Sequence, residues 1–119
     1  MSTVINIFKK YGKCIYISKT CKEPSLAKFP PIICNDGLSL SVQAGVNYYC
    51  SPQEEIDTFE YDAVEVFKTE ELKDDIRMNM FELDKYVYAY VPVELIDLII
   101  EEHKGINYEA IENYIAGLQ

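Results

Sequence analysis

Residues 32–52 read IICNDGLSLSVQAGVNYYCSP, and this stretch decides the fold. Asp36-Gly37 lies in its first half and favours a two-residue type I′ turn, because both residues tolerate a positive φ. Such a turn pairs Ile33 with Leu40 in a β-hairpin. Side chains alternate between the two faces of a strand. The apolar face of the hairpin is therefore expected to carry Ile33, Leu38, Leu40 and Val42.

The opposite face of this hairpin is polar. It carries Ser39, Ser41 and Gln43, whose hydroxyl and amide groups can hydrogen-bond a polar ligand. The chain then continues through Asn47 and Tyr49, which add another amide and an aromatic ring. We expect a polar surface here that is suited to a small polar molecule.

Length restricts the organisation of the protein. The chain has 119 residues, enough for one domain that buries roughly two thirds of its unfolded surface. We expect a single domain over residues 1–119. An apolar run of about 18 residues and a secretory signal are both missing from the sequence, so we expect no membrane partner and a cytosolic location.

The net charge is −9, but it is unevenly distributed. Residues 1–30 contain six lysines and one glutamate, giving +5, so residues 31–119 carry −14. Long duplex nucleic acid needs a broad cationic surface, and we therefore expect no binding to it. Most of the lysines are expected to solvate strand edges. A small anion could still be held by them or by Arg77, the only arginine.

The cysteines show no metal-binding pattern. Cys14, Cys21, Cys34 and Cys50 have neither C-x2-C nor C-x4-C spacing, and His103, the only histidine, is distant in sequence. Without a secretory signal, paired disulfides are not expected either. We predict free, mostly buried thiols and no metal site.

The first half of the chain is predicted to be rich in β-structure. Residues 3–8 and 14–18 are short β-forming runs that predict a first hairpin. Three prolines predict a loop over residues 20–31. An exposed connection is expected over 51–62, and the alternation in 63–67 predicts a strand.

A short helix and a strand are predicted next. Thr69 can cap a helix over residues 70–82, with extended chain over 78–83 as the alternative. Residues 85–91 alternate as a strand. Its tyrosine face is expected to consist of Tyr86, Tyr88 and Tyr90.

Two helices are predicted to end the chain. Pro92 suits the first turn of a helix that runs to His103, and Asn107 is a good N-cap for the last helix. The order of elements predicts an α+β domain: a small antiparallel β-sheet covered on one face by helices, with a C-terminal helical hairpin. Leu98 and Ile100 widen the apolar arc of the first of these helices, so we expect a homo-oligomer, a dimer or larger.

Catalytic motifs are missing from the sequence. It contains no Gly-rich phosphate loop, no nucleophile elbow and no metalloprotease His pair. The carboxylates are neighbours in solvated runs, so no acid–base pair stands out. His103 is better explained by the dipole of the helix it ends than as a general base. We predict a protein that is not an enzyme and uses no cofactor.

Groups that bind ligands are better supplied. Ten tyrosines offer flat faces for stacking a base, amides and hydroxyls offer hydrogen bonds, and Arg77 and the lysines offer phosphate partners. Two alternatives stay open, since at least two of the tyrosines in 85–91 could pack under helices, and Arg77 could pair with Asp74 on an exposed helix. The predicted ligand-binding residues are Asn35, Ser39, Ser41, Gln43, Asn47, Tyr49, Arg77, Asn79 and Phe81.

Two segments resemble a group of small phage and prophage proteins. Those proteins share a C-x-DG-x-S-x-SVQA…YC-x-P segment, matched by residues 34–44 and 49–52, and a Y-x-YVPVE junction, matched by residues 88–94. The chain is similar to the anti-Thoeris sponge proteins of phages, which bind cyclic ADP-ribose isomers made by bacterial immune enzymes and do not cleave them. The resemblance implies a phage anti-defence protein that sequesters a cyclic nucleotide.

The chain departs from the pattern in two places. Gln53 stands where these proteins have arginine after YC-x-P, and Lys104-Gly105 stands where they have Gly-Gly. The first departure removes a phosphate contact, so Arg77 or a lysine would have to supply it. The motif positions carried over are Asn35, Asp36, Ser39, Ser41, Gln43, Tyr49 and Cys50.

The acidic body favours an alternative function. The charge of −14 over residues 31–119 suits an inhibitor that occupies the cationic groove of a bacterial defence nuclease, as anti-CRISPR proteins do. An uncharacterised enzyme is a third hypothesis.

Overall fold

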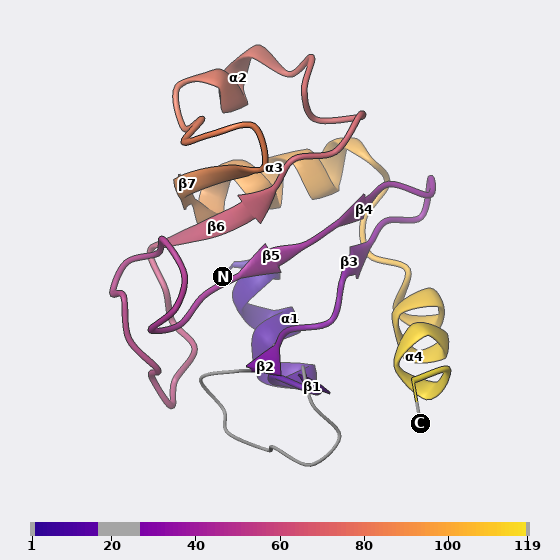
Figure 1. Cartoon of the computed structure of the whole chain (residues 1–119). Coiled ribbons are helices and arrows are strands. Elements are labelled where there is room, and N and C mark those ends of the chain that lie inside the picture. Colours follow the sequence, from indigo (N-terminus) through magenta and orange to yellow (C-terminus); the bar gives the residue numbers. More distant parts are fainter. Residues whose placement is uncertain (1, 17–26, 119) are drawn as a thin grey trace.

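The computed structural model describes residues 2–16 and 27–118 of the chain. It contains helices and short antiparallel strands, most of the strands in one run between the first two helices (Figure 1), which confirms the predicted α+β class. The elements are α1 (Thr3–Tyr11), β1 (Ile15–Tyr16), β2 (Ala27–Lys28), β3 (Ile32–Ile33), β4 (Ser39–Leu40), β5 (Val42–Gln43), β6 (Ala63–Phe67), α2 (Ile76–Asn79), β7 (Val87–Pro92), α3 (Val93–Glu102) and α4 (Tyr108–Ala116).

The described strands pair in three antiparallel sheets: β1-β2, β3-β4 and β5-β6-β7. Helix α3 packs against β7 and α1 packs against α3, so both helices cover the same face of the three-stranded sheet (Figure 1). The predicted strand over residues 63–67 is β6. On the other face of the sheet, the paired residues Gln43 and Glu65 are buried as well.

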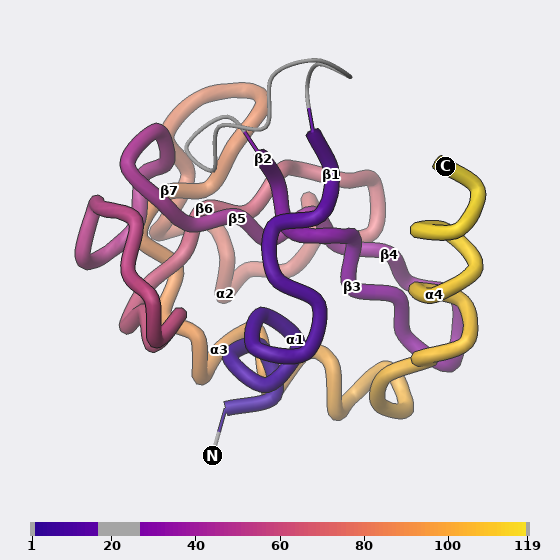
Figure 2. Tube along the Cα trace, turned by 90° about the horizontal axis from the view of Figure 1, so that it is seen from below, coloured from indigo at the N-terminus to yellow at the C-terminus, as the bar shows by residue number. Residues whose placement is uncertain are grey.

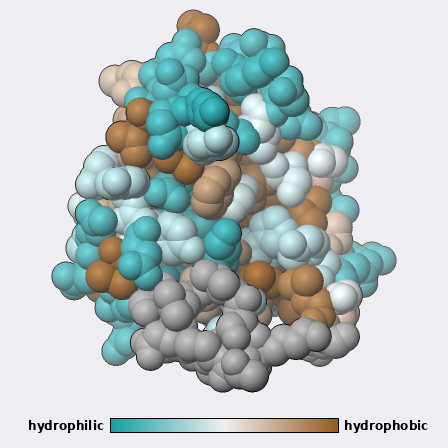
Figure 3. All heavy atoms as spheres, viewed as in Figure 1, coloured by the Kyte–Doolittle hydropathy of each residue, from teal (hydrophilic) through white to brown (hydrophobic). Residues whose placement is uncertain are grey.

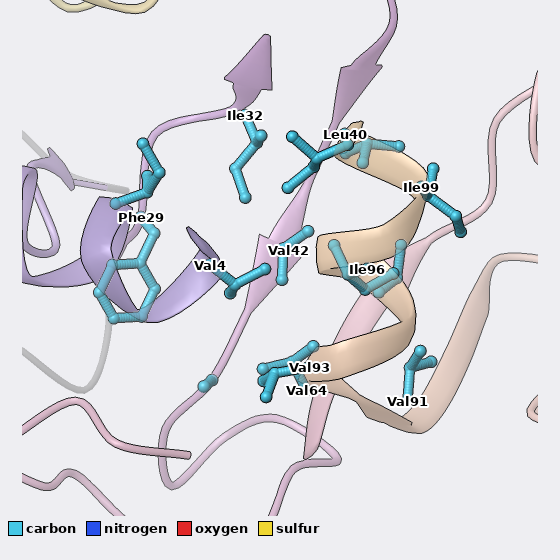
Figure 4. Packing of buried hydrophobic residues seen from close by; sticks show 14 of the residues in the cluster. Val4, Phe29, Ile32, Leu40, Val42, Val64, Val91, Val93, Ile96 and Ile99 are labelled. Carbon is cyan, nitrogen blue, oxygen red and sulfur yellow. The ribbon is translucent and has the colours of Figure 1, made fainter. Parts of the chain in front are cut away.

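The core lies between the three-stranded sheet and these two helices. Val42, Val64 and Val91 point from three different strands toward Val4 of α1 and Ile96 of α3 (Figure 4), and all five are fully buried. Burying an aliphatic side chain of this size contributes about 1.5–3 kcal/mol. The sheet and its two helices are therefore joined chiefly by aliphatic contacts.

The β3–β4 hairpin forms where predicted, with a different turn. Its loop contains three residues, 35–37, because Cys34 donates its N–H to the carbonyl of Leu38 at 2.8 Å. Gly37 has a φ of +99°, which glycine adopts without steric cost. A third residue in the turn shifts the pairing by one position.

This shift changes which isoleucine faces the core. Ile32 pairs with Leu40, and Ile33 pairs with Ser39. Ile32 is fully buried while Ile33 is only half-buried, so the prediction that Ile33 lies on the apolar face of the hairpin is wrong. Leu38, Leu40 and Val42 are buried as expected.

The predicted first hairpin is wrong, because residues 3–11 form helix α1. Ser2 caps it by accepting the N–H of Ile5, and Gly12 with a φ of +65° ends it. Apolar residues recur on one side of the helix and are buried, so tertiary packing outweighs the strand preference of β-branched residues. Its buried residues are Val4, Ile5, Ile7 and Phe8.

The neighbouring predictions are partly outside the described residues. Of the predicted strand 14–18, residues 15–16 form β1 and pair with β2, while 17 and 18 lie outside. Of the predicted loop 20–31, residues 20–26 lie outside and 27–28 form β2. The second strand of the expected hairpin therefore exists, with a different partner.

The predicted helix over residues 70–82 is much shorter. Only α2 is helical, with Asp75 as its N-cap, and turns precede it. The extended alternative over residues 78–83 holds only at Glu82, which forms a β-bridge with Tyr88, because residues 78–79 are helical and 80–81 form a turn. This segment therefore lies alongside β7.

The prediction of a one-sided tyrosine face is wrong. Tyr86 precedes β7 and is exposed, Tyr88 is 1% exposed, and Tyr90 is 48% exposed. Tyr88 and Tyr90 are two positions apart, yet a register irregularity between Val64 and Val66 separates their faces. Only one of the three tyrosines packs inside.

The two C-terminal helices follow β7 as predicted. Asn107 caps α4 by accepting the N–H of Ala110 at 3.0 Å. Helix α4 packs against β3, away from α3 (Figure 2). Ile100 of α3 is buried, so of the two residues that suggested a wide apolar arc only Leu98 is exposed. None of the described helices has the length and apolarity needed to cross a membrane.

Candidate functional site

The nine predicted ligand-binding residues occupy different parts of the structure. Asn35 and Arg77 lie near the C-terminal end of α3. Ser41 and Gln43 lie next to each other on the sheet, with a hydrogen bond of 3.3 Å between their side chains. The remaining five lie in the hairpin, in the loop after β5 and in the segment before β7; they are Ser39, Asn47, Tyr49, Asn79 and Phe81.

Gln43 has a structural role. Its side chain is 1% exposed. Its Oε1 accepts the N–H of Phe29 at 2.9 Å, and its Nε2 donates to the carbonyl of Phe29 at 3.1 Å. These bonds satisfy both ends of a buried amide and hold the chain after β2 against β5. A ligand would have to displace Phe29 to reach this amide.

Asn35 also serves the fold. Its Nδ2 donates to the carbonyl of Lys104 at 2.7 Å, and its backbone N–H donates to the carbonyl of Gly105 at 2.9 Å. These two bonds tie the β3–β4 turn to the connection between α3 and α4.

Arg77 is fully engaged by carboxylates. Its Nε and Nη2 donate to Asp75 at 3.0 and 2.7 Å, and its Nη1 and Nη2 donate to Glu102 at 2.9 and 2.8 Å. The guanidinium holds the pKa values of both carboxyl groups below their usual range. Next to this cluster, Asp36 lies 2.6 Å from the ring of His103. A phosphate could reach Arg77 only by displacing one of two bidentate partners.

Ser39, Asn79 and Asn47 are exposed, and Phe81 is half-buried against the core. Phe81 pairs with β7 by accepting the N–H of Ala89 at its carbonyl.

Tyr49 is the predicted residue that does lie in an organised surface feature. Its ring packs edge-on against Tyr90, with the ring centroids 6.1 Å apart, and the two side chains are 45% and 48% exposed. The hydroxyl of Tyr90 donates to Oε1 of Gln53 at 3.4 Å. We call this surface the tyrosine patch and define it as Tyr49, Gln53, Glu65 and Tyr90.

Tyr90 has an unusual backbone conformation. Its φ is +54°, a region that a bulky side chain rarely adopts and that costs about 1–3 kcal/mol. The backbone N–H of Tyr90 donates to the carbonyl of Tyr49 at 3.1 Å, outside the regular pairing of β7 with β6. A bulge of this kind reorients one side chain. It turns the ring of Tyr90 outward, while Tyr88 points inward.

Glu65 binds the backbone of Tyr49. It is 6% exposed and accepts the N–H of Tyr49 at 3.2 Å. Burial raises the pKa of Glu65 above its ordinary value, while the hydrogen bond from Tyr49 and the nearby ammonium of Lys28 act to lower it. The ammonium of Lys28 also lies 5.1 Å from the ring centroid of Phe67. The patch thus combines two exposed rings with a buried carboxyl group and a neighbouring cation.

Sequence reasoning identified Tyr49 but missed Tyr90, Glu65 and Lys28 as its neighbours. The alternating pattern of residues 85–91 predicts a regular strand through Tyr90, and a bulge is not visible in such a pattern. One signal was available: Glu65 lies between Val64 and Val66 in a strand that is otherwise apolar. A carboxylate in such a position is seldom buried without a reason.

Two of the cavities on the described structure lie elsewhere. One is an open groove of about 840 Å³ along α3, and the other is a smaller hollow of about 280 Å³ beside Lys13 and Glu55. The face of the molecule seen in Figure 3 is mostly hydrophilic, with small separate apolar patches.

The described cysteines are unsuited to catalysis. Cys34 and Cys50 are buried and Cys14 is half-buried, and all three are free thiols, as predicted; Cys21 lies outside the described residues. Burial raises the pKa of Cys34 to about 11 and raises the pKa values of Cys14 and Cys50. A thiol with a raised pKa contains little of the reactive thiolate at neutral pH. Within residues 2–16 and 27–118, no cluster of His, Cys, Asp and Glu is placed to hold a metal ion.

Comparisons of the chain with protein-family models, with curated proteins and with solved structures find no match. The resemblance to the phage sponge proteins therefore stays a prediction from the two sequence segments.

Proposed function

We propose that this protein binds a cyclic ADP-ribose-type nucleotide at the tyrosine patch and sequesters it without cleaving it. In this role it would act as a phage anti-defence protein in the cytosol of the host cell. The observation that carries the proposal is the contact between Tyr49 and Tyr90. Each residue belongs to one of the two segments that resemble the sponge proteins, and residues 53–87 separate these segments in the chain.

The chemistry of the patch supports a ligand with a flat ring. Two half-exposed aromatic side chains can take a base against their faces, and stacking of one base on an aromatic side chain contributes about 1–3 kcal/mol. Gln53 and Glu65 add hydrogen-bonding groups at the edge of the rings. The strained backbone of Tyr90 is consistent with a functional position, because strain of this kind gathers at binding sites.

A cation near the patch replaces the one expected from Arg77. The ammonium of Lys28 lies 5.1 Å from the ring centroid of Phe67, which is two residues after Glu65 in β6. We assign the phosphate contact to Lys28, because the guanidinium of Arg77 is shared between Asp75 and Glu102. A lysine in this role compensates for Gln53, which stands where the sponge proteins have arginine.

Sequestration makes a physical demand that catalysis does not. The protein must be abundant, and its dissociation constant must lie below the concentration at which the signal acts.

The fate of the ligand tests the proposal. The protein would be mixed with an extract that contains the nucleotide signal, separated by filtration and heated, and the released molecules identified by mass spectrometry. We expect the intact cyclic nucleotide. A cleaved product would show an enzyme instead, and release of no nucleotide would contradict the proposal.

A further inference from the structure

The exposed side of α3 forms the larger of the two cavities. Glu94, Leu98 and Glu101 lie on this side, since residues three, four and seven positions apart share one face of a helix. The N-terminal end of α1, which packs beside α3, forms one wall (Figure 2). Ile106 and Tyr108 form the other wall, at the start of α4. The result is an open groove with a volume of about 840 Å³.

The groove is apolar in the middle. Leu98 is 45% exposed there, and Tyr108 is exposed to the same degree. Ile106 is half-buried beside them. A large aliphatic side chain on the surface of a helix is suited to contact another apolar side chain.

The two ends of this apolar strip carry carboxylates with no salt-bridge partner. Within the described residues, neither Glu94 nor Glu101 has a cation within ion-pair distance, whereas Glu55, Glu82 and Glu102 do. Asp97 lies between them, but it is half-buried and caps α1 by accepting the N–H of Val4 at 2.8 Å. Lys104 also lines the groove, so its charged side chains are one ammonium and three carboxylates, those of Glu94, Asp97 and Glu101. The groove thus keeps a net negative charge that a cationic partner can meet.

The spacing of the carboxylates defines what would fit. Glu94 and Glu101 are seven positions apart in α3, which places them about 10 Å apart along the helix axis. On a partner helix, two cationic side chains seven positions apart would span the same distance, with an apolar residue midway to meet Leu98. Oppositely charged surfaces also associate faster.

We propose that this groove is a docking site for a basic amphipathic helix of another protein. A second copy of this chain fits less well, because a two-fold contact through α3 would bring Glu94 and Glu101 of both copies together. Nucleic acid is repelled by the same carboxylates. The surface is separate from the tyrosine patch, so this inference does not depend on nucleotide binding.

A synthetic helical peptide provides the probe. It would carry leucines on one face and lysines seven positions apart beside them, and a second peptide would have glutamate in place of lysine. Fluorescence anisotropy would measure binding of each peptide to the full chain at low and high salt. We expect the basic peptide to bind and to weaken as salt is added, and the acidic peptide not to bind.

Matched variants place the contact. Leu98→Ser, and separately Glu94→Lys with Glu101→Lys, should each weaken binding by about tenfold or more, equivalent to about 1.4 kcal/mol. The controls are Ile76→Ser, and Glu54→Lys with Glu71→Lys, which change exposed residues of the same types that do not line the groove. They should bind the peptide like the unaltered protein. All the altered side chains are exposed, so thermal melting should confirm that each variant folds.

Three results would overturn the proposal. One is failure of the basic peptide to bind, and another is an equal loss of binding in the controls. The third is a dimer in sedimentation that becomes a monomer on Leu98→Ser, because the groove would then belong to a second copy.

Discussion

The ammonium of Lys13 lies 2.6 Å from Oε1 of Glu55, a carboxylate that is 32% exposed. The Lys13 side chain is 6% exposed and lies against the rings of Phe29 and Tyr48, each with its centroid 5.5 Å from Nζ. Glu55 also accepts the N–H of Val46. Glu55 thereby connects the loop that contains Val46 to Lys13, which follows α1.

This arrangement predicts that Gly45→Ala destabilises the fold. Gly45 has a φ of +142°, and a Cβ there would lie 2.2 Å from Oε2 of Glu55 and 2.3 Å from Nζ of Lys13. The strain and the displaced ion pair should lower the free energy of unfolding by about 1–3 kcal/mol. Gly117→Ala is the control, because its nearest atoms are 3.5 Å away and its φ is ordinary. Urea denaturation measures both, and equal stability of the two variants would contradict this account.

Lys13→Met removes the cation but retains the length of the side chain. Glu55 would then lack its charged partner while 32% exposed, so we expect a loss of about 1–3 kcal/mol, less than for a fully buried pair. Lys9→Met is matched to it, because Lys9 and Glu60 form an exposed pair at 3.5 Å that should contribute under about 1 kcal/mol. Thermal melting of the two variants compares them. A larger loss for Lys9→Met would show that burial of Lys13 has no energetic consequence.

Tyr90→Gly should separate stability from binding. Glycine adopts a φ of +54° without the strain that tyrosine bears there, and the lost ring is half-exposed. We expect the free energy of unfolding to stay within about 1 kcal/mol of the unaltered value, while nucleotide binding is lost. The contrasting variant is Tyr88→Gly, which removes a buried ring and should cost about 3–5 kcal/mol. If Tyr90→Gly unfolded the protein as readily as Tyr88→Gly, the ring of Tyr90 would be part of the core.

Glu65 predicts a pH dependence of stability. Burial raises the pKa of its carboxyl group above the ordinary value of 4.5, so folding favours the protonated form. Its contribution to stability is present below pH 4.5 and is lost as pH rises through the higher pKa of the folded state. Glu65→Gln lacks this loss, so the stability of the variant relative to the unaltered protein should increase over that range. Denaturation at several pH values measures the difference, and a constant difference would mean that the carboxyl group titrates as in water.

Arg77→Ala tests the reassignment of the phosphate contact. The sequence allowed this arginine to bind the ligand, whereas the structure pairs it with Asp75 and Glu102. We expect a melting temperature lower by a few degrees at low salt, a smaller decrease at high salt, and unchanged nucleotide affinity. Lys28→Ala should instead weaken binding. The opposite pattern of affinities would return the phosphate contact to Arg77.

Local signals explain the parts of the fold that the sequence predicts well. Asn107 as an N-cap, Pro92 before α3 and the strand at residues 63–67 each depend on one or two neighbouring residues, and each is found in the structure. Such signals fail at residues 3–11. The β-branched side chains there favour a strand, but the segment forms helix α1 because a helix buries its apolar residues together against the core. The turn at residues 35–37 adds one residue to a loop, and the pairing of the strands changes with it.

The candidate site was harder to predict for a related reason. Gln43 and Arg77 have the right chemistry for a ligand, but their partners, Phe29 and Glu102, are distant in sequence and use that chemistry internally. Tyr90 meets Tyr49 only because of a bulge in β7. Pairings over such distances are set by the tertiary fold and leave no periodic trace in the sequence.

Calorimetric titration with a panel of cyclic ADP-ribose isomers tests the central claim most directly. The unaltered protein should release heat with at least one isomer, and Tyr90→Ala should lose this binding. Tyr86→Ala should retain this binding, because Tyr86 lies outside the tyrosine patch, although it is more exposed than Tyr90. Absence of heat with every isomer, or equal affinity of the Tyr90→Ala protein, would contradict the assignment of the tyrosine patch as a nucleotide site.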